Sequence, residues 1–239
     1  MLVTPGSQRD AVIDRQLAIT LASIAGGINA AAFYAVGFFS ANMTGNVSAL
    51  SDRIATGALS SAWLYLVIVI AFIAGAATCT FVILAAERRG VVGAHALVIL
   101  LEGLLLAPLS LVDLWLAGTV RVALLVIWLA FLMGMQNAVV THLSNARVRT
   151  THVSGMATDL GIEIALAWKL RGDANPNASG NDTRLRLHLT TIVAFLVGGV
   201  AGVVLYQFCG GYALLVASAL LCMLGLRGIV SARARSRLA

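Results

Sequence analysis

Residues 17–39 read LAITLASIAGGINAAAFYAVGFF, a stretch of the chain without a charged side chain. A helix needs about 20 predominantly apolar residues to cross the hydrocarbon core of a bilayer. The stretch is longer than the apolar region of a secretory signal peptide, which has about 7 to 15 residues, and 16 mostly polar residues precede it. It therefore predicts a first membrane-spanning helix rather than a cleavable signal.

The rest of the chain is equally apolar. Of its 239 residues, 60% are hydrophobic and only 11% are charged, whereas about a quarter of the residues in a soluble domain are charged. A soluble fold of this size has no interior large enough for so much apolar surface. The composition predicts a polytopic membrane protein and excludes a nucleic-acid-binding protein, a secreted disulfide scaffold and a disordered chain.

Six segments have the length and composition of membrane spans. Two further segments, 43–57 and 153–170, are shorter or partly polar, and each carries a hydroxyl residue followed by glycine near its start. Serine and threonine are favourable helix N-caps, so Thr44 and Ser154 are predicted to begin two re-entrant helices. Such helices occur where they are buried in protein or line a water-filled cavity. The predicted spans are 17–39, 62–85, 94–114, 120–140, 187–208 and 212–226.

The distribution of basic residues predicts the orientation. With the N-terminus inside, 14 basic residues fall on the cytoplasmic side, and only Arg53 and Arg121 fall outside. An excess of Lys and Arg in cytoplasmic loops sets the orientation of membrane proteins. Both termini are therefore expected in the cytoplasm. The inner residues are Arg9, Arg15, Arg88, Arg89, Arg147, Arg149, Lys169, Arg171, Arg184, Arg186, Arg227, Arg233, Arg235 and Arg237.

The chain also contains an internal repeat. Residues 22–30 (ASIAGGINA) and 130–138 (AFLMGMQNA) share alanine, glycine, asparagine and alanine at one constant offset of 108. Residues 71–75 (AFIAG) resemble 194–198 (AFLVG), and the two hydroxyl-glycine pairs follow in the same order. Each copy holds three spans, an odd number, so the second copy enters the membrane from the opposite side. Such inverted repeats are common in transporters, with the site at the repeat interface.

The predicted fold is therefore an all-α membrane protein with six transmembrane helices, two short re-entrant helices and a three-plus-three inverted repeat. A cytoplasmic segment, 1–16, precedes the first membrane repeat, 17–117. The second repeat covers 118–228 and includes a polar, flexible loop at 171–186. A basic cytoplasmic tail follows at 229–239.

Two stretches resemble a known family. Residues 27–50 and 134–164, above all MTGN at 43–46 and ARVRTTH at 146–152, are similar to the signature stretches of the YoaK family of bacterial inner-membrane proteins. Ser154 stands where threonine is more usual in that family, and it keeps the hydroxyl. The resemblance extends over essentially the whole chain. It implies a multi-pass membrane protein, and it supplies neither a substrate nor catalytic residues.

Polar groups at membrane depth are costly and face a partner or a cavity. Asn29 and Asn137 either line a site or hydrogen-bond between the two repeats. The amino ends of the two short helices present free N–H groups and a partial positive charge, which favours a polar or anionic solute. The alternative is a satisfied N-cap and a tight turn. The predicted substrate-binding residues are Asn29, Thr44, Gly45, Asn46, Asn137, Ser154, Gly155 and Arg149.

Four charged residues have further interpretations. Arg149 either attracts an anion from the cytoplasm or anchors the orientation. Glu102, near the centre of the third span, couples protons, bonds to a neighbouring helix or lies beside Gly103 in a solvated crevice. Asp159 and Glu163 share a helix face and are expected to pair with nearby arginines rather than to bind a cation.

Enzymatic and metal-binding motifs are missing from the sequence. It has no G-x-S-x-G, no H-E-x-x-H and no P-loop. Its cysteines, which occur at 79, 209 and 222, lie in apolar runs and are expected to be buried, and its histidines lack metal-ligand spacing. We therefore expect no catalytic residue, no metal and no cofactor.

The sequence favours a transporter or channel for a small polar or anionic solute. The alternative is a non-transporting membrane scaffold or sensor module. A third hypothesis is a lipid-modifying enzyme, for which His152 with Asp159 and Glu163 is the candidate acid–base group. The expected partners are the lipid bilayer, the solute and, because small-residue helix faces are plentiful, a second copy of the chain; no nucleic acid is expected.

Overall fold

The computed structural model describes residues 1–2, 9–169 and 177–236, and only the backbone of residues 177–179. This part of the chain is helical, and six of its helices are long and apolar enough to cross a membrane, as the sequence predicts. The helices are α1 (Ala11–Val36), α2 (Met43–Ala55), α3 (Leu59–Arg88), α4 (Ala94–Trp115), α5 (Gly118–Ser144), α6 (Val153–Lys169), α7 (Asn177–Cys209) and α8 (Tyr212–Ser236).

Two predicted boundaries are wrong. The last span was expected to be short, yet α8 continues to Ser236, through much of the predicted tail. The predicted loop 171–186 is helical from Asn177 onward, and its residues before 177 lie outside the described part of the chain. Asp182 and Arg186 form an ion pair 2.9 Å long one helical turn apart, which supports the helix in this polar stretch.

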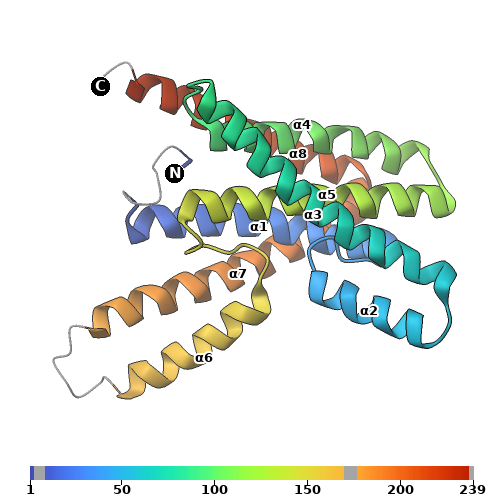
Figure 1. Cartoon of the computed structure of the whole chain (residues 1–239), viewed down its shortest axis with the longest axis horizontal. Helices are drawn as coiled ribbons and strands as arrows, with labels where there is room; N and C mark the ends of the chain where they lie inside the picture. The colour runs from blue at the N-terminus through green and yellow to red at the C-terminus, as the bar shows by residue number, and fades with distance from the viewer. Residues whose placement is uncertain (3–8, 170–176, 237–239) are drawn as a thin grey trace.

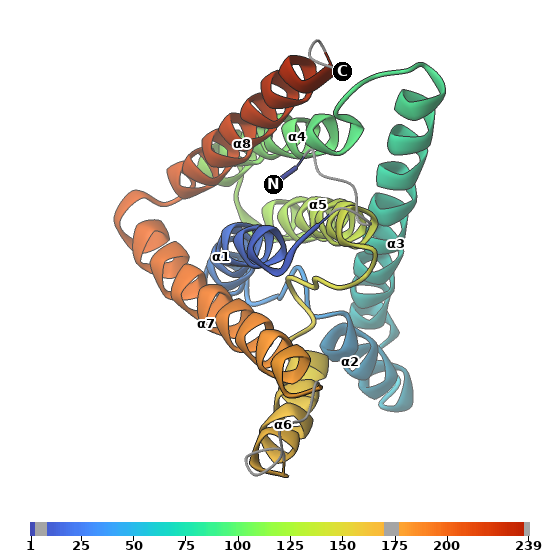
Figure 2. The same cartoon turned by 90° about the vertical axis from the view of Figure 1, so that its left-hand side faces the viewer.

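The long helices form a bundle around α1 and α5. Figure 2 shows these two helices in the middle, with α3, α4, α7 and α8 around them. Helix α1 packs along α7, α3 along α5, and α4 along α8. The start of α1 and the end of α8 lie at the same end of the molecule (Figure 1), which we call the terminal end.

Glycines allow all three of these helix pairs to approach to backbone contact. A Cβ atom at Gly26 of α1 would overlap the carbonyl oxygen of Phe195 in α7, and one at Gly198 would overlap that of Ser23. The α3–α5 pair has the same arrangement, with Gly75 against the Phe131 carbonyl and Gly134 against that of Phe72. Small residues at such crossings allow close van der Waals packing, which drives helix association in membranes.

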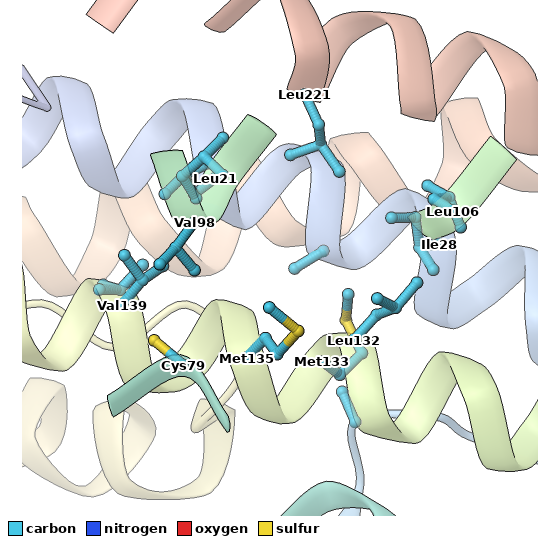
Figure 3. Packing of buried hydrophobic residues seen from close by; sticks show 14 of the residues in the cluster. Leu21, Ile28, Cys79, Val98, Leu106, Leu132, Met133, Met135, Val139 and Leu221 are labelled. Carbon is cyan, nitrogen blue, oxygen red and sulfur yellow. The ribbon is translucent and has the colours of Figure 1, made fainter. Parts of the chain in front are cut away.

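The apolar core lies where the central helices meet α4 and α8. Figure 3 shows side chains of α1, α4, α5 and α8 converging between the helices. Leu21, Leu106, Met133 and Leu221 are fully enclosed there. By contrast, outward-facing apolar side chains such as Phe81, which is 70% exposed, cover the outside of the bundle, as expected for a surface that meets lipid.

The short helices α2 and α6 lie on the outside of the bundle. Helix α2 packs on α3 and α6 packs on α7. Figures 1 and 2 both show them beginning near each other, and Figure 1 shows these beginnings close to the middle of the long axis. From there α6 runs toward the terminal end and α2 toward the opposite end (Figure 1).

Candidate functional site

Asn29 and Asn137, which match between the two predicted repeats, hold loop segments in place. Asn29 Oδ1 accepts hydrogen bonds from the backbone N–H of Ala41, at 2.8 Å, and from the Ser40 hydroxyl, at 3.4 Å. Asn137 Oδ1 accepts from the Thr151 hydroxyl at 2.8 Å. Each carboxamide thus holds the segment between its own helix and the following short helix, so neither bonds between the repeats as the sequence alternative proposed.

The start of α2 differs from the prediction. Its N-cap is Asn42, whose Oδ1 accepts from the N–H of Gly45 at 3.0 Å, so Thr44 is not the cap and its side chain is exposed. A Cβ at Gly45 would press against Asn42, which explains the glycine. Asn46 is buried, and its Nδ2 donates to the Phe39 carbonyl at 3.3 Å. These residues form a packed turn, which agrees with the alternative of a satisfied N-cap and a tight turn.

The start of α6 is more open. Ser154 is exposed in the first turn of the helix, which begins at Val153. A Cβ at Gly155 would meet only Nη1 of Arg149, at 3.8 Å, so this guanidinium lies over the first turn. Partial loss of water around the ring and the Arg149 charge lower the pKa of His152, which favours its neutral form. The helix end and Arg149 together provide positive potential here.

A charged pocket lies between α1, α6 and α7 at the terminal end, with a volume of about 610 Å³. Acidic and basic side chains from all three helices reach it, together with Arg147 from the α5–α6 connection. Its charged and polar lining comprises Arg9, Asp14, Arg147, Asp159, Glu163, Asn181, Thr183, Arg184 and His188.

Ion pairs organise most of these charges. Asp14, which is buried, pairs with Arg9 at 2.6 Å and with Arg147 at 2.9 Å. The sequence predicted an arginine partner for Glu163. In the described part of the chain its carboxylate instead contacts Nδ1 of His188, at 3.0 Å. This contact ties α6 to α7.

Two charges of the charged pocket remain without an ion pair in the described part of the chain. They are Asp159 of α6 and Arg184 of α7. The expected pairing of Asp159 with an arginine is therefore wrong. One available charge of each sign allows the pocket to bind a polar solute of either sign or a zwitterion.

A smaller cavity of about 110 Å³ adjoins the charged pocket and shares Arg147, Asp159 and His188 with it. It also reaches Arg149 and the first turn of α6. Farther along α7, Asn29 is one of the residues that line an apolar groove of about 610 Å³. Of the predicted site residues, Arg149 therefore lies next to the charged pocket, and Asn29 lies in the apolar groove.

The opposite end of the bundle is held by a different polar cluster. Asp113, at the end of α4, pairs with Arg121 of α5 at 2.6 Å. Tyr206 of α7 donates its hydroxyl to Asp113 at 2.6 Å and accepts from Arg121 at 2.9 Å. This cluster joins α4, α5 and α7 at that end.

Glu102 lies away from these pockets. It is fully buried in α4, and Nε2 of Gln136 in α5 donates to its Oε1 at 3.0 Å. The bond to a neighbouring helix agrees with one of the three sequence interpretations, and the full burial of Glu102 contradicts the solvated crevice. Its partner Gln136 was not singled out from the sequence, although a glutamine in a membrane span is itself unusual.

Sequence reasoning also missed Asp14 and His188. Asp14 lies just before the first apolar run. Its position between two basic residues, Arg9 and Arg15, is the sequence feature that could have identified it. The contact of Arg147 with Asp14 joins segments that are 133 residues apart, so only the fold reveals it. One expectation about packing is wrong as well, because Cys209 is exposed at the end of α7.

The described residues contain no group of three or more His, Cys, Asp or Glu side chains placed to hold a metal ion. A family model described as a protein of unknown function (DUF1275) matches residues 17–226, nearly the whole chain. No curated protein and no solved structure matches the chain.

Proposed function

The chain belongs to the DUF1275 family, the YoaK-like family expected from its sequence, and we propose that it is a transporter or channel for a small polar or anionic solute. The observation that carries this proposal is the charged pocket between α1, α6 and α7. Buried charge is expensive in a membrane protein and typically marks a solute or ion pathway.

The charges of this pocket match the solute class. Asp14 and Glu163 are nearly enclosed; Asp14 is paired with two arginines, and Glu163 contacts His188. Asp159 and Arg184 stay available to a ligand, and the adjoining cavity adds Arg149 and the amino end of α6. Charged hydrogen bonds of this kind are stronger than neutral ones and select a polar solute.

Reciprocal helix contacts support the proposed inverted repeat, and through it the proposed transport function. Gly26 and Gly134 are 108 positions apart, and each abuts a phenylalanine carbonyl, at Phe195 and Phe72, which are 123 positions apart. The same helix contact is therefore made by α1 with α7 and by α5 with α3. In transporters built from inverted repeats, one repeat rocks against the other around a site between them.

The proposed re-entrant character of α2 and α6 rests on their position. They begin near each other at mid-length and run toward opposite ends (Figure 1). We place the terminal end in the cytoplasm of a bacterial inner membrane because the predicted cytoplasmic loops hold nearly all the basic residues. With that orientation, the charged pocket is a cytoplasmic vestibule and α6 descends beside it.

A membrane scaffold or sensor is the second candidate, and the asparagines favour it. Asn29 and Asn137, which were predicted to line a site, are engaged in fastening loops. In a scaffold the ends of the short helices would be dry. Solvent access to these ends therefore separates the two functions.

The first test maps that access. The three cysteines are replaced, and single cysteines are introduced at Thr44, at Ser154 and, as a lipid-facing control, at Ile73, which is 61% exposed in the middle of α3. We expect a membrane-impermeant thiol reagent to label Thr44→Cys from outside intact cells and Ser154→Cys from inside-out vesicles, and to leave Ile73→Cys unlabelled. Protection of both sites from both sides would favour the scaffold.

The second test measures flux in liposomes with a panel of small anions, zwitterions and neutral polar solutes. We expect Asp159→Asn or Arg184→Gln to reduce the flux of the transported solute by about tenfold, the effect of losing about 1.4 kcal/mol of binding. Asp52→Asn, on the exposed face of α2, is the matched control and should retain the flux. If no solute in the panel moves, the transport proposal fails.

A further inference from the structure

The strongest unexplained feature is the contact between Glu102 and Gln136. Both side chains are fully buried between α4 and α5, and Nε2 of Gln136 donates to Oε1 of Glu102 at 3.0 Å. The second oxygen of each group, Oε2 of Glu102 and Oε1 of Gln136, is buried without a hydrogen-bond partner in the described structure. Buried polar atoms are rarely left in this condition.

The missing partner has to be a donor, because both unpartnered atoms are acceptors while Glu102 is ionised. No group around Glu102 donates a hydrogen bond to either atom in the described structure, and the nearby thiols are only weak donors. Cys79 of α3 is a buried thiol that interacts with Glu102, and on the α8 side Gly103 meets Cys222 and Ser218. Ser218 donates its own proton to the Gly103 carbonyl at 2.7 Å. No cation is paired with Glu102 among the described residues.

We propose that Glu102 is a proton-binding site: its carboxyl group is protonated at neutral pH, and Oε2–H donates to Oε1 of Gln136. One proton then satisfies both unpartnered atoms and closes an acid–amide pair with two parallel hydrogen bonds. It also removes a negative charge whose burial without a partner would be very costly.

The Glu102–Gln136 pair has no counterpart at the corresponding positions, although the glycine contacts between helices do recur. Gly103 abuts the Cys222 backbone and Gly225 abuts that of Leu100, so positions of α4 and α8 that are 122 apart make the same contact. By this spacing Leu224 corresponds to Glu102, and by the spacing of 108 Ile28 corresponds to Gln136. The α1–α8 side therefore holds apolar residues at these positions. Helix packing alone does not require the polar pair, which points to a role for its exchangeable proton.

This inference does not depend on transport. In the proposed transporter, Glu102 would carry the coupling proton, and this role rests on the proposed function. Release of the proton requires water or a base to reach α4, as in the opening of one repeat against the other.

Infrared spectroscopy tests the site directly. Wild type, Glu102→Gln and the control Glu163→Gln are placed in lipid nanodiscs at neutral pH, and absorption by protonated carboxyl groups is recorded in H₂O and D₂O. We expect a band that wild type and Glu163→Gln share and that Glu102→Gln lacks. Identical spectra for wild type and Glu102→Gln, or a band that appears only on acidification, would overturn the proposal.

A second variant guards against misfolding of Glu102→Gln. Gln136→Leu leaves Glu102 in place but removes both hydrogen bonds, so the carboxyl band should shift to higher frequency. An unshifted band would show that Gln136 is not the partner and would equally overturn the pairing. If the band assigned to Glu102 is found while the liposomes show no flux, the proton site is retained and the proposed function fails.

Discussion

In the first half of the chain, Gly75 of α3 abuts the Phe131 carbonyl of α5; in the second half, Gly198 of α7 abuts the Ser23 carbonyl of α1. The two contacts are alike, whereas the polar residues of the halves are not. At positions 108 apart, Asp14 corresponds to Val122. Backbone packing tolerates only glycine at a crossing, so both halves retain it. The differing polar groups are the better guide to chemistry.

Leucine substitutions at the crossings should break this correspondence with the largest effect. We expect Gly26→Leu and Gly134→Leu each to abolish the folded, monodisperse protein, because the new side chain would displace the backbone of the neighbouring helix. Size-exclusion profiles in detergent check this. Gly161→Leu is the matched control, since nothing lies near that position. Wild-type behaviour of either crossing variant would refute the shared contact.

The next largest effect concerns a charge present in only one half. Asp14→Asn weakens the pairs with Arg9 and Arg147 and leaves buried positive charge, so we expect a loss of about 3 kcal/mol in the free energy of unfolding. Chemical denaturation in detergent measures it, with Glu87→Gln, an exposed carboxylate of α3, as the control. A loss no greater than that of Glu87→Gln would mean that the charged pocket is not stabilised by this cluster.

The two asparagines sharpen the comparison further. Both Asn29→Ala and Asn137→Ala should cost about 1 kcal/mol, the usual scale for a polar contact in a membrane protein. Asn29→Ala should cost more because it leaves the buried N–H of Ala41 unpaired, whereas the Thr151 hydroxyl can rotate to another acceptor. Thermal unfolding of the two variants side by side gives the order. The reverse order would show that the loops are held differently.

The smallest effect is electrostatic and belongs to α6. Because the pKa of His152 is lowered, its neutral form is favoured in the folded protein. The contribution of His152 to folding stability should therefore fall as the pH drops below about 6.5, the ordinary value, and should be constant above it. Arg149→Gln removes one cause and should raise the pKa of His152, as NMR titration of labelled histidine would detect. An unchanged pKa would exclude Arg149 as a contributor.

Much of the architecture was predictable because it depends on local composition. The six spans, the two short helices and the repeat positions 26, 75, 134 and 198 are read directly from apolar runs and small residues. Helix ends were less predictable. Asn42, not Thr44, caps α2, because both residue types are good caps and only the course of the loop after Phe39 decides between them.

The candidate site was predicted only in part. Arg149 and Asp159 were singled out and lie at the charged pocket or its adjoining cavity. The pairing of Asp14 with Arg147 and of Glu163 with His188 was missed. Each of these pairs joins different segments of the chain, and no local pattern records which distant side chain a charge will meet.

By itself, the sequence determined that this is a membrane protein, which segments form its helices and which small residues recur. These properties follow from the cost of exposing backbone and charge to lipid, which every segment meets independently. Only the tertiary structure decided which polar groups come together: Glu102 with Gln136, Asp14 with two arginines, and the charges around the pocket between α1, α6 and α7. Those contacts depend on how helices cross, and the crossings bring together residues that are far apart along the chain.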